Sequence, residues 1–250
     1  MTRATQASNT VRWTRRQFLG LLGGTLAGAL LPGWARASQP EPGRVTIGGL
    51  AVWDWRDKLP VRHTRPLGGD LSLLTWDPER KYWRYRLRNR PITTAVVHHS
   101  VSSANYTLLQ FVSIHIEEDE RDPYPECAYH FIIDKAGAIH YCVDMSRRTW
   151  HSSTQTNDSA VGMCLLGTFM GDAMPTAAQL ASGRRLLTAL RREMPFLHFS
   201  PHSGMPGADT WCPGDTWPRW RDRILPLPEE NKPQPRNPEF YSPTGLVARG

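Results

Sequence analysis

The chain has 250 residues, 40% of them hydrophobic and 21% charged, which suits one folded domain with extensions. Its formal net charge of +7 is typical of proteins that bind nucleic acid. However, residues 1–37 hold five arginines and no acidic residue, so the remainder has 25 basic and 23 acidic residues. Because this charge is nearly balanced and no recognised nucleic-acid module is present, we expect no nucleic-acid partner.

Residues 1–37 have the features of a twin-arginine signal peptide. Paired arginines lie within Thr14–Leu19, a Gly/Ala/Leu stretch covers 20–31, and Ala35–Ala37 is a small-x-small cleavage site. The apolar stretch is well short of the roughly 20 residues that a spanning helix needs. We therefore expect export by the twin-arginine route, cleavage before Ser38, and a periplasmic or secreted protein without a stable membrane span.

Residues 38–90 contain isolated tryptophans among proline, glycine and arginine, with no sustained helical or alternating period. We expect an N-terminal extension packed on a domain at 91–225. At the other end, residues 226–250 contain six prolines and many polar residues, which cannot bury enough surface to become ordered. This segment is predicted to be a flexible tail.

The first elements of the central domain are a strand and a helix. The apolar run Ile92–Val97 is typical of a buried strand and delivers His98 at its carboxyl end. From Tyr106 to Glu118, apolar residues recur with a helical period, which predicts an amphipathic helix that ends before Pro123.

A hairpin of two strands and one further strand are predicted after this helix. The segments 130–134 and 138–143 flank Lys135-Ala136-Gly137, which is a hairpin signal. Residues 160–167 form another apolar run that predicts a buried strand.

The clearest helix begins at Thr176, which forms a capping box with Gln179 and precedes a periodic leucine stripe. Pro195 ends the pattern, and residues 198–200 form a short strand. Strands that alternate with helices predict an α/β domain with a central mixed sheet flanked by helices.

Three potential metal ligands lie at the ends of these elements. His98, His202 and Cys212 offer two imidazoles and one thiolate, which leaves the fourth position of a tetrahedral zinc site open for water. Catalytic zinc sites are built in this way, whereas structural sites fill all four positions. His99 is an alternative to His98 as the first ligand.

Several sequence blocks in a fixed order surround these ligands. They are Val96-Val97-His98-His99-Ser100, Ala128–Ile133, Trp150-His151-Ser152, Ser159–Gly167, and His202 followed by Thr210–Asp215. Together they resemble the type 2 N-acetylmuramoyl-L-alanine amidases, which include amidase-type phage lysozymes and peptidoglycan recognition proteins. The resemblance spans residues 91–222 and implies a single α/β domain with a zinc site in a cleft at strand ends.

The resemblance also implies roles for single residues. His98, His202 and Cys212 match the family's zinc ligands, and Tyr129 matches its catalytic tyrosine. Thr210 stands where phage-type members carry a lysine and catalytic recognition proteins a threonine, and its hydroxyl can donate to an oxyanion.

Three further residues are assigned to substrate contact. His151 matches a histidine that lines the family's cleft, and Trp150 and Asn157 are placed in the same groove from their positions. The ten residues between His202 and Cys212 form a somewhat longer loop than is usual in the recognition-protein branch.

The other cysteines are Cys127, Cys142 and Cys164. Cys164 lies in an apolar strand and is expected to be a buried free thiol. Cys127 and Cys142 either pair in an oxidising compartment or stay free, since the sequence does not fix their distance.

Because Cys212 is retained, the resemblance implies a catalytic member. We expect a monomeric zinc amidase that acts on peptidoglycan or muropeptides and cuts the bond between N-acetylmuramic acid and L-alanine. Two alternatives stay open: a non-catalytic peptidoglycan-binding module, and an exported or prophage cell-wall toxin that uses the same chemistry.

Overall fold

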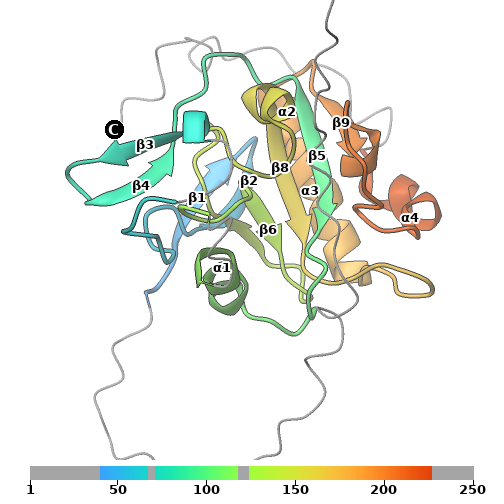
Figure 1. Ribbon diagram of the computed structural model, residues 1–250. Coiled ribbons are helices and arrows are strands. Elements are labelled where there is room, and N and C mark those ends of the chain that lie inside the picture. Colours follow the sequence, from blue (N-terminus) through green and yellow to red (C-terminus); the bar gives the residue numbers. More distant parts are fainter. Residues whose placement is uncertain (1–39, 67–70, 118–123, 227–250) are drawn as a thin grey trace, which may run out of the picture. The chain divides into compact units, whose positions relative to one another are not determined.

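The computed structural model describes residues 40–66, 71–117 and 124–226. The expected signal peptide and all but the first residue of the expected tail lie outside these ranges. Within them, a mixed sheet has the strand order β1-β2-β7-β6-β8-β5-β9 (Figure 1). Its strands are β1 (Gly43–Ile47), β2 (Leu50–Asp54), β5 (Thr94–His99), β6 (Phe131–Ile133), β7 (Ile139–Tyr141), β8 (Ala160–Leu165) and β9 (His198–Pro201).

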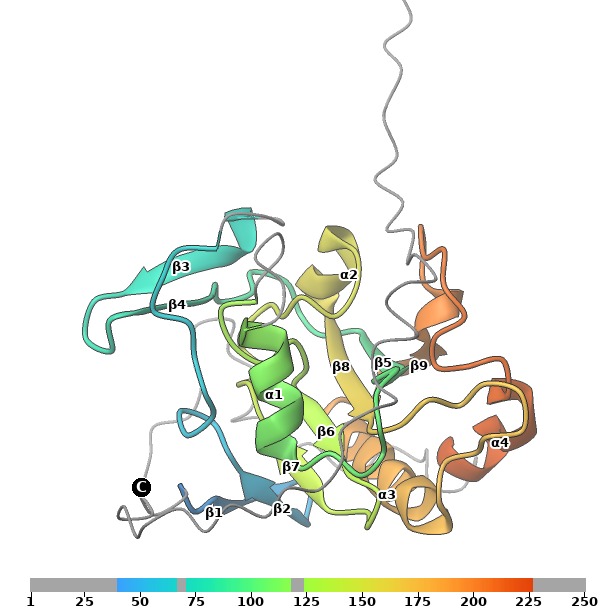
Figure 2. The same cartoon turned by 60° about the horizontal axis from the view of Figure 1, so that its bottom comes forward.

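Helices cover both faces of this sheet (Figure 2). They are α1 (Leu108–Glu117), α2 (Thr154–Ser159), α3 (Ala177–Glu193) and α4 (Trp217–Ile224), with short 3-10 turns η2 (Leu71–Leu73) and η3 (His202–Gly204). Helix α3 buries its leucines in a core that includes Met163 and Leu165 of β8. Helix α1 packs in a second core, which includes Cys164 of the same strand. The predicted α/β fold with one central mixed sheet is therefore confirmed.

Most predicted elements of the central domain are confirmed. Strand β5 begins two residues later than predicted and includes both His98 and His99. The hairpin β6–β7, strand β8 and helix α1 lie where the sequence placed them. The capping box is also present, since the Thr176 hydroxyl accepts from the Gln179 N–H and the Gln179 side chain accepts from the Thr176 N–H.

The extension contributes strands that the sequence interpretation missed. β1 and β2 form a hairpin around Gly48 and Gly49, whose positive φ values of 51° and 79° suit a tight turn. A Cβ at Gly48 would collide with the carbonyl of Ala189 on α3, so this turn fits against the helix without a side chain. Because β2 pairs with β7, the extension and the central domain share one sheet, and a boundary at residue 91 would cut through it.

The rest of the extension packs on the α1 side of the sheet. Strands β3 (Leu74–Asp77) and β4 (Tyr82–Tyr85) form a separate antiparallel pair. Leu74 and the fully buried Tyr85 share a core with Phe111 of α1.

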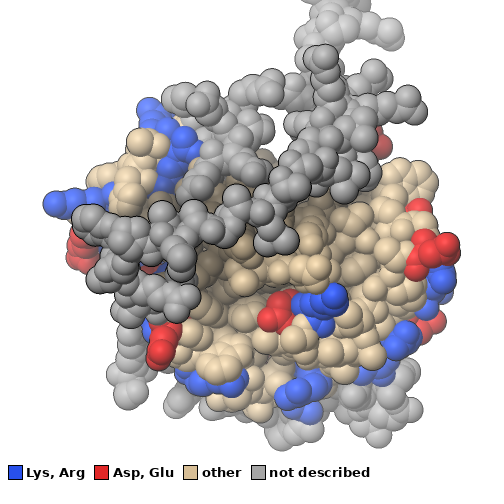
Figure 3. Space-filling view, turned by 90° about the horizontal axis from the view of Figure 1, so that it is seen from below, with Lys and Arg blue, Asp and Glu red and all other residues tan. Residues whose placement is uncertain are grey.

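Figure 3 shows basic and acidic side chains interspersed over the face seen from below. This agrees with the nearly balanced charge of residues 38–250.

The structure has no disulfide among the described cysteines. Cys164 is fully buried in β8, as predicted. Cys127 and Cys142 are buried as well and are not joined by a disulfide in this structure. In the described part of the chain, no helix combines the length and apolar character needed to cross a bilayer.

Candidate metal centre

Two neighbouring strands and one loop bring the predicted ligands together. In strand β5, His98 pairs with Cys164 of β8, and paired residues of adjacent strands point to the same face. His98 therefore points to the face covered by α1. His202 follows β9, which runs parallel to β5. The loop that carries Cys212 is tied back to η3, because its carbonyl accepts from the Ser203 N–H at 2.7 Å.

The donor atoms of His98, His202 and Cys212 all lie within 4.8 Å of one another. The Cys212 Sγ is 3.6 Å from His98 Nδ1, and the two imidazole centroids are 4.6 Å apart. Tetrahedral zinc, with bonds of about 2.3 Å to sulfur and about 2.0 Å to nitrogen, separates such donors by about 3.6 Å. We call these three residues the donor cluster, and both its chemistry and its spacing fit zinc.

Burial sets the protonation of the donor cluster. It lowers the pKa of His98 well below its usual range and that of His202 to about 4, so both imidazoles are in the neutral form that binds metals. Burial raises the pKa of the Cys212 thiol to about 12. The His99 backbone N–H, which is 3.4 Å from the sulfur, works against this rise. The thiolate therefore forms most readily when a cation shares the site.

His99, the alternative first ligand, points away from the donor cluster. It pairs with Leu165, which belongs to the core on the α3 side. Its Nδ1 accepts a hydrogen bond from the Phe169 N–H at 3.2 Å. Strand register therefore brings His98, and not His99, to His202 and Cys212.

Tyr129 lies beside the donor cluster. Its ring centroid is 5.2 Å from that of His98, and it stacks on Phe111 of α1 at 6.4 Å. Burial raises the pKa of Tyr129 well above its usual range. The phenol consequently keeps its proton and is suited to donate a hydrogen bond.

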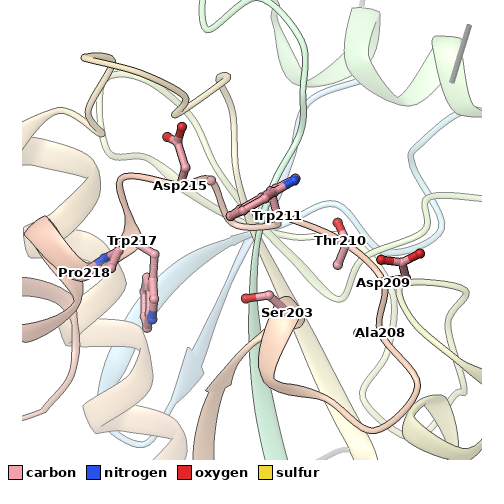
Figure 4. Close-up of a pocket in the computed structure, with 9 residues that line it drawn as sticks. Ser203, Ala208, Asp209, Thr210, Trp211, Asp215, Trp217 and Pro218 are labelled. Atoms are coloured by element: carbon pink, nitrogen blue, oxygen red, sulfur yellow. The ribbon is translucent and has the colours of Figure 1, made fainter. Parts of the chain in front are cut away.

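Thr210 lies in the exposed part of the loop that leads to Cys212. Its hydroxyl oxygen accepts the Cys212 N–H at 3.1 Å, which fixes the oxygen and leaves the hydroxyl hydrogen to donate. Thr210 and Trp211 border a hollow of about 440 Å³, which Trp217 at the start of α4 also lines (Figure 4). Trp211 is 73% exposed.

The three residues assigned to substrate contact have different surroundings. Trp150 is half-buried, with edge contacts to the rings of Tyr85 and Tyr124. Asn157 is fully buried, and its amide bonds both the N–H and the carbonyl of Ser152. Asn157 therefore stabilises the loop at Ser152 and is not exposed to a substrate.

His151 is also interior, since its side chain is 4% exposed. Its Nδ1 lies 3.1 Å from Nε2 of His98. His151 therefore contacts His98, the first predicted metal ligand, and does not line the hollow.

The sequence interpretation overlooked Arg88 and His130. Arg88 is half-buried, and its guanidinium donates to four backbone carbonyls, those of Met145, Arg147, Asp158 and Ala160. His130 accepts the Gly162 N–H at 3.0 Å and, through its other nitrogen, donates to the Arg147 carbonyl at 3.0 Å. We call this set the Arg88 clamp. In the sequence, Arg88 alternates with Arg86 and Arg90, and nothing in this pattern distinguishes it as the arginine that makes these contacts.

A mixed sheet that brings two imidazoles and a thiolate to one point defines an α/β protein with a donor set for a transition metal. The family model for N-acetylmuramoyl-L-alanine amidases (Amidase_2) matches residues 88–215, just over half of the chain, and this range contains the whole donor cluster. The chain belongs to this amidase family. Membership supports an amidase or peptidoglycan-binding role.

Similar solved structures include phage, bacterial and insect proteins. The Ph2119 endolysin of a Thermus scotoductus bacteriophage is 17% identical, with a TM-score of 0.49 over 56% of this chain and 90% of the endolysin. The endolysin amidase LysCS from Clostridium intestinale is 23% identical (TM-score 0.48; 56% and 88% covered). Drosophila PGRP-LB is 21% identical (TM-score 0.43; 52% and 82%). No curated protein matches the chain. The family assignment does not depend on these likenesses.

Proposed function

We propose that the protein is a zinc-dependent N-acetylmuramoyl-L-alanine amidase. It would hydrolyse the amide that joins the lactyl group of N-acetylmuramic acid to L-alanine in peptidoglycan or muropeptides. The observation that carries this proposal is the convergence of His98, His202 and Cys212 in a member of the amidase family. A non-catalytic relative would not need to keep a thiolate at this point.

The donor cluster would hold the metal through two neutral imidazoles and one thiolate. When bound, zinc supplies a Lewis acid that polarises an amide carbonyl and lowers the pKa of a water molecule to about 7. The open fourth position of the three-ligand set is where substrate and water would meet.

Two neighbouring hydroxyls complete the proposed site. The protonated Tyr129 phenol, beside His98, would donate a hydrogen bond to the negative charge that develops on the carbonyl oxygen. The Thr210 hydroxyl, held by the Cys212 N–H, would donate from the loop side. In the overall reaction water adds to the carbonyl carbon, the C–N bond breaks, and the alanine nitrogen takes up the proton that the water loses.

Mass spectrometry of peptidoglycan after incubation with the purified protein tests this proposal. New peptides with a free L-alanine amino terminus should appear, disappear with a chelator, and return when zinc is added. Intact glycopeptides from a folded, zinc-loaded protein would instead identify a peptidoglycan-binding relative. Full activity after complete zinc removal would refute the metal mechanism.

We also propose that the protein acts outside the cytoplasm. The support is the paired arginines Arg15 and Arg16 before a short apolar stretch. Replacement of both by lysine should keep the protein in the cytoplasmic fraction of a host that has a twin-arginine system. Unchanged appearance in the periplasm would contradict this route.

A further inference from the structure

Among the described residues, His151 makes the closest polar contact with a side chain of the donor cluster, through His98. His98 Nε2 and His151 Nδ1 are 3.1 Å apart, and the two rings meet edge to face with centroids 5.1 Å apart. Both side chains are buried, at 1% and 4% exposure. The other nitrogen of His98, Nδ1, is the one that faces Cys212.

We propose that His151 is a positioning residue, which accepts a hydrogen bond from His98 Nε2–H and so keeps His98 Nδ1 aimed at the metal. The inference rests on the proposed zinc centre and assigns to His151 a task different from substrate contact. Partners of this kind orient the ligand ring, fix its tautomer and increase its basicity.

The tautomers follow from the two contacts of His98. A neutral imidazole carries one N–H, so a His98 that offers Nδ1 to a cation must carry its hydrogen on Nε2. The 3.1 Å contact then has His98 as donor and His151 Nδ1 as acceptor. His151 must in turn carry its hydrogen on Nε2, a buried atom that makes no hydrogen bond of good geometry among the described residues, although the Ala160 backbone also acts on this ring.

The sheet is shaped to hold the His151 ring in this place. A Cβ built at Gly162 would lie 2.6 Å from His151 Cγ, so the ring rests directly on the backbone of β8. Strand β8 cannot give way easily, because the Gly162 N–H is bonded to His130 Nδ1 at 3.0 Å. On the other side, the Asn157 amide bonds both backbone groups of Ser152, the residue that follows His151.

Zinc affinity, measured by competition with a chromophoric chelator, tests the inference without any substrate. His151→Leu keeps the bulk but removes the acceptor, and should weaken zinc binding by about 10- to 100-fold. His151→Asn places an amide oxygen near the position of Nδ1 and should restore affinity to within a few-fold of the natural protein. The visible spectrum of the Co²⁺-loaded protein should change with Leu and revert with Asn, because it reports ligand geometry.

Two further variants separate positioning from general damage. Gly162→Ala keeps His151 but displaces its ring, and should weaken zinc binding in the same direction. His63→Leu makes the same chemical change at an exposed histidine of the extension and should leave zinc affinity unchanged. Unchanged zinc affinity in a folded His151→Leu protein would overturn the inference, and so would an equal loss in the Leu and Asn variants.

The outcomes for this inference and for the amidase proposal can be told apart. Zinc binding that depends on His151, in a protein that leaves peptidoglycan intact, would support the positioning role and remove the amidase. Zinc-dependent hydrolysis by a protein whose zinc affinity does not change when His151 is replaced would support the amidase and refute the positioning role.

Discussion

The donor cluster and the Arg88 clamp lie on the same face of the sheet and are both largely removed from solvent, yet their polar groups are satisfied in opposite ways. In the clamp, the contacts with the backbone each join an N–H to an acceptor. In the donor cluster, two imidazole nitrogens and a sulfur converge. A set of polar groups that the backbone completes is structural, whereas converging lone pairs are suited to a cation.

Burial alone does not separate these two regions. It lowers the pKa of His130 to about 3 and that of His98 well below its usual range. Both histidines are therefore neutral, and a ranking of histidines by depressed pKa would select both. The partners of each ring nitrogen decide which histidine is suited to a metal.

Cys212→Ser should have the largest effect, because it removes the thiolate from the donor cluster. We expect zinc affinity to fall by more than about 100-fold, since loss of an outer hydrogen bond alone costs 10- to 100-fold, and hydrolysis to fall to background. Metal content and peptide release measure the two effects. Cys142→Ser, a matched change at a buried thiol outside the cluster, should keep zinc. Stoichiometric zinc of unchanged affinity in the Cys212 variant would show that the cluster is not the metal site.

Tyr129→Phe should separate metal binding from catalysis. Loss of one preorganised donor is expected to lower kcat by about 10²- to 10³-fold, with zinc affinity and KM little changed, because the phenol is not a ligand. Steady-state kinetics on a soluble muropeptide gives this split. A comparable loss of zinc would instead place Tyr129 among the residues that hold the metal.

Arg88→Ala should act on the fold and not on the metal. Its guanidinium bonds join the segment before β5 to residues 145–160, so their loss leaves buried carbonyls without donors. We expect the free energy of unfolding to fall by about 3 kcal/mol in urea titrations. Zinc affinity of the protein that remains folded should change by no more than a few-fold. A protein of normal stability that lost its zinc would contradict the separation of the two regions.

Local sequence signals predicted the sheet centre and α3, and missed the sheet edge. The apolar runs of β5 and β8 and the capping box at Thr176 each act within a few residues. β1 and β2 are five-residue strands with partly exposed positions. β1 pairs with β2, and β2 pairs with β7 some 90 residues later. The Gly48-Gly49 pair was the signal that could have identified their turn.

The site was predictable in its residue types and less so in its geometry. His98 could be separated from His99 only by the register with β8, which is a contact between distant segments. The burial of His151 and Asn157 depends on a loop that the Arg88 clamp fixes from about 60 residues away. No pattern within residues 144–159 encodes that contact.

Glu126 provides the smallest and most local test, since it is a buried carboxylate with features of both regions. The Tyr85 N–H donates to it at 3.0 Å, but burial is only partly offset and raises its pKa to about 7. Between pH about 4.5 and about 7 the folded protein therefore retains a proton that the unfolded chain releases. Stability falls as the pH rises through this window, by at most about 3 kcal/mol.

Glu126→Gln keeps an acceptor for the Tyr85 N–H and removes the charge. Urea unfolding at pH 5 and pH 8 should show a loss of stability in the natural protein that exceeds the loss in the variant by about 2 kcal/mol. An equal loss in both proteins would assign the pH dependence to other groups. A flat profile in the variant would show that one backbone N–H does not fully stabilise the Glu126 carboxylate at neutral pH. The groups of the Arg88 clamp, by contrast, have backbone partners, and those of the donor cluster converge on one point.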